Sequence, residues 1–133
     1  MNLRSLITML LVLPILYTCN ACKKKEEAFD EKLAGIQFVQ MPFEEVATGE
    51  TLQIKVVMAA SNECGDFNRF EENWPNDNTL EVKAYLRYPQ EGVCPQVIKT
   101  VEKIYNFTPK AAGQYILKFY AGGPFLSKRV FVR

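Results

Sequence analysis

The stretch TLQIKVVMA (51–59) shows the pattern that decides the fold. Its residues Leu52, Ile54, Val56 and Met58 are large and apolar and recur at every second position. Side chains of a β-strand point alternately to opposite faces, so this spacing places these residues on one face. In an amphipathic helix they would recur every three or four positions instead. The stretch therefore predicts a half-buried β-strand.

The same alternation continues on both sides of this stretch. Further strands are predicted at GIQFVQM (35–41), TLEVKAYLRY (79–88), from about Thr100 in QVIKTVEKIYNFTP (96–109), GQYILKFYA (113–121) and KRVFVR (128–133). Pro42 suits the edge position that we expect for the first of them. Short strands with almost no helical pattern predict an all-β domain, a single antiparallel β-sandwich of about seven strands.

The phrase FTPKAAGQYILKF (107–119) resembles the turn and penultimate strand of immunoglobulin-like domains. In that family a tyrosine at this place packs on the core and hydrogen-bonds the backbone at the corner. The resemblance implies that role for Tyr115 and an Ig-like sandwich over residues 34–133. Two features depart from the family pattern. The expected core strand has no tryptophan, and the cysteines do not fall on the strands that the antibody disulfide joins, so the likeness is one of architecture.

Residues 1–21 have the three parts of a secretory signal peptide: a short start with Arg4, the apolar run LITMLLVLPILY (6–17), and small or polar residues. The run is too short for a bilayer span, which takes about 20 apolar residues. An uncleaved membrane anchor or a buried core helix is the alternative interpretation. A cysteine at the exit of such a leader resembles the lipobox of bacterial lipoproteins, in which the leader is cut before a cysteine that then carries acyl chains. This resemblance implies export and membrane attachment through an N-terminal lipid.

Two cysteines, Cys19 and Cys22, compete for the lipid. Ala21 gives Cys22 the small preceding residue that fits the peptidase, whereas Leu16, three places upstream, favours Cys19. Cysteine parity decides between them. Lipidation of Cys22 leaves an even pair in the domain, whereas lipidation of Cys19 leaves an odd thiol in an oxidising compartment. We therefore predict lipidation of Cys22, with Cys19 as the alternative.

The residues KKKEE (23–27) follow Cys22 directly. They resemble the lysine-plus-acid signal of surface lipoproteins of the Bacteroidetes type, which directs the protein to the outer face of the outer membrane. The charge of residues 22–33 also predicts a flexible tether, because charge-dense segments cannot bury enough apolar surface to fold. Both interpretations can hold together. We expect an outer-membrane, lipid-anchored protein, with surface exposure favoured over a periplasm-facing orientation.

Cys64 and Cys94 lie in segments that are expected to be loops. In an exported protein they are expected to form a disulfide. A reactive thiol pair is the alternative, but the CxxC spacing typical of such pairs is absent. Closing a loop of this length would stabilise the fold by about 3–4 kcal/mol in the chain-entropy model.

The segment SNECGDFNRFEENWPNDN (61–78) combines acids with three aromatic residues, Phe67, Phe70 and Trp74. Their spacing of three and four predicts a short helix over residues 66–72 with the rings on one face. The rings would then either form a lid over one end of the sandwich or act as a platform for a sugar or a partner protein. A calcium site is a third option, weakened by the absence of a D-x-D-x-D-G spacing.

The composition narrows the function classes. The chain has no histidine, so a Ser-His-Asp or Cys-His arrangement and a His/Cys zinc site are excluded. Without the leader the acidic and basic side chains balance, which argues against nucleic acid as a partner. We predict no cofactor, no metal and no catalytic residue, and expect a non-catalytic binding module for a protein or glycan. The alternatives are a small hydrolase using loop carboxylates such as Asp66 and Glu71, or a protease-inhibitor-like loop binder.

Overall fold

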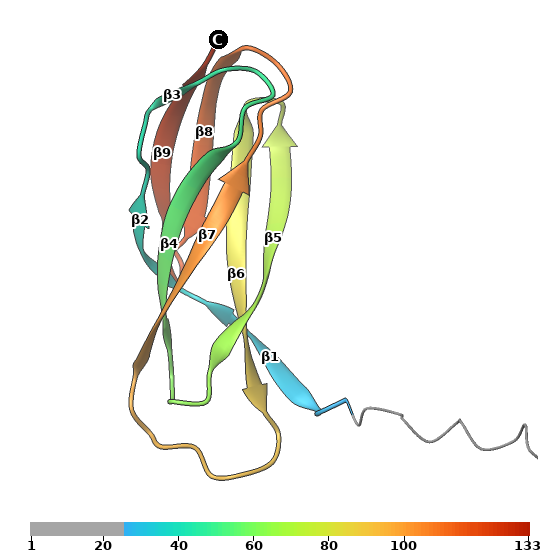
Figure 1. Ribbon diagram of the computed structural model, residues 1–133, viewed down its shortest axis with the longest axis vertical. Helices are drawn as coiled ribbons and strands as arrows, with labels where there is room; N and C mark the ends of the chain where they lie inside the picture. Colours follow the sequence, from blue (N-terminus) through green and yellow to red (C-terminus); the bar gives the residue numbers. More distant parts are fainter. Residues whose placement is uncertain (1–25) are drawn as a thin grey trace, which may run out of the picture.

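The computed structural model describes residues 26–133, which form two packed β-sheets (Figure 1). Its strands are β1 (Phe29–Ala34), β2 (Ile36–Gln40), β3 (Glu45–Val46), β4 (Leu52–Ala60), β5 (Asp66–Asn76), β6 (Thr79–Pro89), β7 (Lys99–Phe107), β8 (Gly113–Tyr120) and β9 (Phe125–Val132). One sheet has the order β1-β6-β8-β9-β3, with β5 also paired to β6, and the other has the order β2-β4-β7. The predicted all-β sandwich is confirmed. Residues 26–133 contain no helix long and apolar enough to cross a membrane.

The alternating stretches supply the core between the two sheets. Leu52, Ile54, Val56 and Met58 of β4 are all buried, as the alternation predicts. They join one buried cluster with Leu80, Val82, Ala84 and Leu86 of β6 and with Leu117, Phe119 and Val130 of β8 and β9. β4 pairs with β7 without interruption from Leu52↔Phe107 to Ala60↔Lys99. Alternate side chains of β4 and β6 therefore fill the interior between the sheets.

Nine strands occur in residues 26–133, against the seven expected, and two pairings are parallel. β3 runs parallel to β9, and β6 runs parallel to β8 over Thr79–Val82. The other pairings are antiparallel, so the predicted antiparallel sandwich holds except at these two places. The β5–β6 hairpin places β5 at the outside and β6 beside β8, and both β6 and β8 run away from the same end (Figure 1).

The sandwich begins at Phe29, although residues 22–33 were expected to form a tether. β1 pairs with β6 from Phe29↔Pro89 to Ala34↔Ala84. Its side chains are exposed up to Leu33, so the strand depends on backbone pairing rather than on burial. The density of charged residues suggested an unfolded tether, but a strand with exposed side chains can form wherever a neighbouring strand provides backbone hydrogen bonds. The predicted leader and the cysteines Cys19 and Cys22 lie outside the described residues.

The predicted disulfide is present and lies at the end of the sandwich where β1 begins. Cys64 and Cys94 have Cα atoms 5.6 Å apart and join the turn after β4 to the loop after β6. Gly65 packs so closely here that an added Cβ would lie 2.5 Å from the Cβ of Ala60 and 2.7 Å from the Tyr88 ring. The Tyr88 hydroxyl in turn accepts a hydrogen bond from the backbone N–H of Ser61 at 3.0 Å. We call this region the disulfide end.

The corner before β8 has the geometry that the immunoglobulin resemblance implies for Tyr115. Its ring is buried, and its hydroxyl donates to the backbone carbonyl oxygen of Ala111 at 2.9 Å. Gly113 opens the strand with a φ of +144°, a conformation that side chains rarely adopt. The expected role of Tyr115 is confirmed.

Candidate functional site

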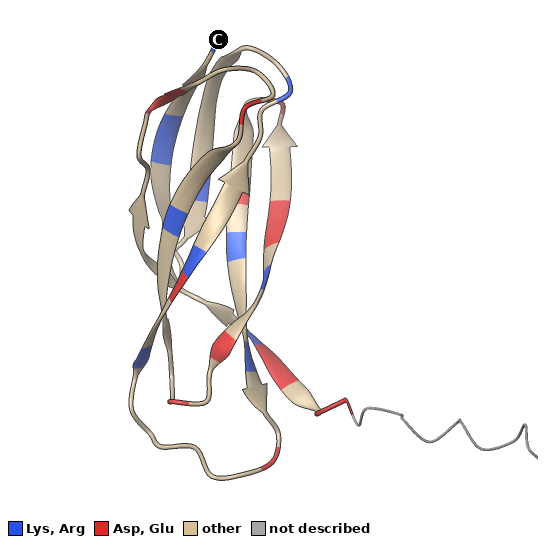
Figure 2. Ribbon diagram, viewed as in Figure 1, with Lys and Arg blue, Asp and Glu red and all other residues tan. Residues whose placement is uncertain are grey.

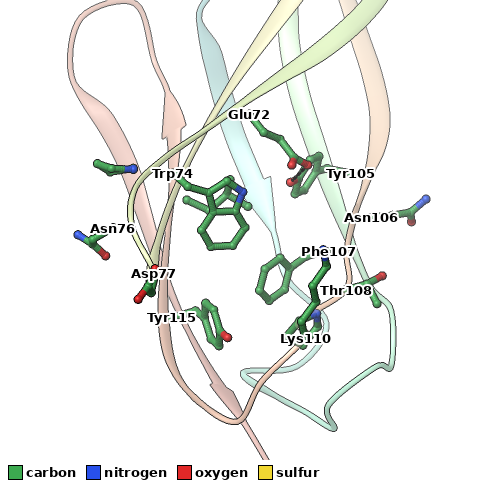
Figure 3. A pocket seen from close by; sticks show the side chains of 13 residues that line it. Glu72, Trp74, Asn76, Asp77, Tyr105, Asn106, Phe107, Thr108, Lys110 and Tyr115 are labelled. Carbon is green, nitrogen blue, oxygen red and sulfur yellow. Dashed lines mark hydrogen bonds between the residues drawn. The ribbon is translucent and has the colours of Figure 1, made fainter.

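A pocket of about 570 Å³ opens at the end of the sandwich opposite the disulfide (Figure 3). It lies between the end of β5, the end of β7 and the loop that leads into β8. Its volume falls in the range of small-molecule and cofactor sites, roughly 300–1,000 Å³. We call it the aromatic pocket, because its walls include Trp74, Phe107 and Tyr115.

The three rings meet edge to face. The ring centroids of Trp74 and Tyr115 are 6.3 Å apart with planes at 84°, and those of Phe107 and Tyr115 are 5.6 Å apart at 64°. Figure 3 shows them turned toward a common space. Phe107 and Tyr115 are buried, whereas Trp74 is 45% exposed. The pocket therefore has a buried aromatic base and one open indole face.

Glu72 and Tyr105 form the polar inner wall of the pocket. Glu72 lies opposite the buried Val82 on β6, so it shares the inward face of the sheet. The Tyr105 hydroxyl donates to Oε1 of Glu72. Burial, and then this hydrogen bond and the carboxylate charge, raise the pKa of Tyr105 far above its usual value. The phenol therefore stays protonated and keeps the carboxylate oriented.

The rim of the pocket carries both charge and hydrogen-bonding groups. Asp77 and Lys110 line it, together with the amide of Asn76 and the hydroxyl of Thr108. Asn76 accepts the backbone N–H of Asn78 at 3.0 Å, which leaves its NH₂ group for a ligand. Elsewhere acidic and basic residues are interspersed over both sheets (Figure 2). The pocket thus joins flat apolar faces to a few placed polar groups, the composition typical of ligand sites.

The three predicted aromatic residues, Phe67, Phe70 and Trp74, lie in two different places in the structure. Residues 66–76 form strand β5, so the predicted helix over 66–72 is wrong. The register shifts between Phe67 and Arg69, so a bulge brings Phe67 and Phe70 to the same face although they are three residues apart. A bulged strand thus reproduces the spacing that suggested a helix.

Phe67 and Phe70 pack against the core from the edge of the sandwich. Their ring centroids are 4.7 Å apart, and Phe70 meets Tyr105 at 5.2 Å. Tyr105 continues the contact to Phe119 at 5.9 Å. These four rings form what we call the inner aromatic row. Phe67 and Phe70 therefore pack on the core, and of the three predicted rings only Trp74 lines the pocket.

The carboxylates considered for hydrolysis lie elsewhere. Asp66 and Glu71 are opposite Arg87 and Lys83, four positions apart along β6, or about 13 Å. Paired carboxylates of glycosidases are about 5–9.5 Å apart and face each other across a substrate. Here Asp66 lies 3.7 Å from Arg87, and Glu71 lies 3.2 Å from Arg69. These two acids belong to the outer face of the sheet and do not share a cleft.

The pocket includes residues that sequence reasoning did not select: Glu72, Asp77, Tyr105, Phe107 and Lys110. The sequence placed Tyr105 and Phe107 in a predicted strand and gave no indication of a binding role. Their contribution to a pocket depends on which strand lies across from the end of β7, and that is a tertiary property.

The aromatic pocket and the disulfide lie within the part of the chain that matches a known domain family. The model of the ORF11 β-sandwich domain family matches residues 54–130. The chain belongs to this family. The ORF11 β-sandwich domain as matched runs from β4 into β9 and so contains the pocket, the inner aromatic row and the disulfide. No curated protein and no solved structure matches the chain.

Proposed function

We propose that the chain is a bacterial envelope lipoprotein of the Bacteroidetes type, anchored by lipid on Cys22, whose sandwich is a non-catalytic binding module. The ligand occupies the aromatic pocket. The observation that carries the proposal is the pocket itself, in which a half-exposed Trp74 meets buried aromatic neighbours beside polar groups. A protein or a glycan could use such a site, and its polar rim favours a glycan.

Sugar recognition explains this combination of groups. The apolar face of a pyranose packs on a flat ring, while its hydroxyls need placed donors and acceptors. Trp74 offers the ring, and Glu72, Asn76 and Asp77 offer acceptors and an amide donor. Leaving a tryptophan 45% exposed forgoes much of the apolar burial that it could contribute to stability, and such positions concentrate in binding sites.

The position of the pocket supports a membrane-anchored role. β6 begins with Thr79 opposite Asn76 at the pocket and ends with Pro89 opposite Phe29, where the chain enters β1 (Figure 1). Its length places these ends roughly 33 Å apart. A lipid on Cys22 would therefore hold the disulfide end near the bilayer and present the pocket at the distal end.

Trp74 also provides the direct test, since it is the only tryptophan in the chain. Titration with a panel of oligosaccharides should change the intrinsic fluorescence, and Trp74→Ala should abolish binding measured by calorimetry. The matched control is Phe131→Ala, which removes a ring that is also 45% exposed but lies outside the pocket. Equal losses in the two variants, or no sugar that binds, would overturn the glycan proposal.

The anchor has its own test. Cys22→Ala should abolish incorporation of labelled fatty acid and release the domain from membranes, whereas Cys19→Ala should keep both properties. Protease shaving of intact cells then reads the orientation. Cleavage supports surface exposure, and protection until the outer membrane is opened supports a periplasm-facing domain.

A second candidate rests on the loop between β6 and β7. Val93 is 98% exposed and directly precedes Cys94. The disulfide of Cys94 holds the loop in place. So does the carbonyl oxygen of Pro95, which accepts the backbone N–H of Glu63 at 3.1 Å. A rigid, exposed loop with an apolar side chain suits insertion into a peptidase groove. Val93→Asp should then abolish inhibition of the target peptidase without altering glycan binding.

A further inference from the structure

We infer that the aromatic pocket selects a cationic saccharide, an oligosaccharide that carries free ammonium groups on its sugar rings. This inference rests on the proposed glycan-binding function and specifies its ligand class. Three features of the pocket carry it: the perpendicular aromatic faces, the charges of the lining residues, and the volume.

The aromatic faces attract positive charge. The face of an aromatic ring carries negative electrostatic potential, and tryptophan is the strongest of the three rings in this respect. Because Trp74 and Tyr115 meet at 84°, the edge of one ring approaches the other, and they form a corner rather than a stack. The exposed indole face can therefore accept an ammonium group as well as a sugar ring.

The ionisable residues of the pocket carry a net negative charge. Two carboxylates, Glu72 and Asp77, line it against one ammonium, that of Lys110. Tyr105 binds only Oε1 of Glu72, so Oε2 can accept a ligand donor. In residues 26–133, Asp77 takes part in none of the ion pairs, which are Lys55–Glu102, Arg69–Glu31, Arg69–Glu71, Arg87–Asp66 and Arg133–Glu45. Both acids are thus available to a cation.

The acids on the outer face of β5 differ from those of the pocket, because they already have a cationic partner. There Glu31 and Glu71 are occupied by Arg69, at 2.7 Å and 3.2 Å. Glu72 follows Glu71 directly in the chain but points to the other face, where its neighbour is the neutral Tyr105. A carboxylate without a cationic partner beside an open aromatic face is the arrangement that ammonium recognition requires.

The volume indicates that the ammonium belongs to a larger molecule. The cavity of about 570 Å³ far exceeds what one ammonium group fills and matches one or more sugar rings. Neutral sugars would use the indole face but would leave the negative charge unpaired. An amino sugar uses the indole face and also pairs the negative charge, because its ring packs on Trp74 while its ammonium meets Glu72 or Asp77.

Two probes with one backbone separate charge from shape. They are the β-1,4-linked tetramer of glucosamine and its fully N-acetylated counterpart, titrated at about pH 6, where the amino groups are protonated. The protein is the full chain with Cys22→Ser, which leaves every described residue unchanged. We expect the cationic tetramer to bind at least about tenfold more tightly, the ratio that 1.4 kcal/mol produces. The change in Trp74 fluorescence measures both affinities.

Two variants assign the preference to the pocket. Glu72→Gln keeps an acceptor for Tyr105, and Asp77→Asn keeps the shape, so both should lower affinity for the cationic tetramer several-fold more than affinity for the neutral tetramer. Asp66→Asn makes the same charge change at the disulfide end and should have no effect.

Equal binding of the two tetramers, or tighter binding of the neutral one, overturns this inference and leaves the glycan-binding proposal standing. An equal effect of Asp66→Asn and Asp77→Asn shows attraction by overall charge and also overturns it. Binding of neither tetramer, with no other sugar bound, overturns both.

Discussion

Strand β5 delivers three aromatic side chains to two different environments. At its first half, Phe67 and Phe70 join the inner aromatic row and continue through Tyr105 to Phe119 in the core. At its second half, Trp74 leaves this row and meets Tyr115 at the open pocket. The same kind of side chain thus contributes to stability at one place and to a binding surface at the other. Residue type alone does not distinguish these roles, because the structure across from each ring decides them.

The two ends of the sandwich show the same contrast. At the disulfide end, a covalent bond, the close approach of Gly65 and the Tyr88 hydrogen bond hold neighbouring segments together. At the pocket end, aromatic rings and carboxylates surround a cavity. We therefore expect substitutions at the disulfide end to lower stability and leave binding intact, and substitutions in the open part of the pocket to do the reverse.

The largest expected loss of stability comes from the disulfide. Replacing Cys64 and Cys94 by alanine releases a link between residues separated by 30 positions and should lower the free energy of unfolding by about 3–4 kcal/mol. Denaturant unfolding followed by circular dichroism measures this loss. Ligand affinity at the pocket should not change while the variant remains folded, and a large change in affinity would break the proposed separation of the two ends.

Tyr115→Phe should have an intermediate effect. It keeps the ring that meets Trp74 but removes the hydrogen bond to the Ala111 carbonyl oxygen. The expected cost is about 1 kcal/mol, since the carbonyl loses its donor. Thermal unfolding should report a modest decrease, with ligand affinity close to that of the unaltered chain. An unaltered stability would mean that this corner does not need the hydroxyl.

The smallest effect concerns the attachment of β1. The Arg69 hydrogen bond holds the pKa of Glu31 below its usual value of 4.5, so the folded state favours the charged carboxylate. Its contribution is therefore present above the unfolded-state pKa and is lost as the pH falls below 4.5 through the folded-state pKa. Amide exchange in β1 should accelerate on acidification, and Glu31→Gln should reduce this pH dependence. An identical pH dependence in the variant would assign it to another group.

The sequence predicted the alternating strands because their burial follows a simple period. Leu52 to Met58 in β4 and Leu80 to Leu86 in β6 needed no tertiary information. Tyr115 could be assigned from a local phrase, because its hydrogen bond closes within four residues. The disulfide followed from cysteine parity and the expected compartment.

The remaining features depend on pairing across the chain. The bulge in β5 gives Phe67 and Phe70 a helical spacing, so the strand was misread. β1 has exposed, charged side chains, and only its pairing with β6 makes it a strand. The pocket joins Trp74 to Phe107 and Tyr115 from three separate segments, and no local pattern predicts that they meet.

The division of β5 between stability and binding is tested most directly by comparing Phe70→Ala with Trp74→Ala in denaturant unfolding under one set of conditions. Phe70 packs against the core, so its loss should cost about 2 kcal/mol, less than the 3–5 kcal/mol of a fully buried phenylalanine. Trp74→Ala should cost less than about 1 kcal/mol, because its ring is half exposed. A loss for Trp74→Ala equal to or larger than that for Phe70→Ala would show that Trp74 is a structural lid and would contradict the account.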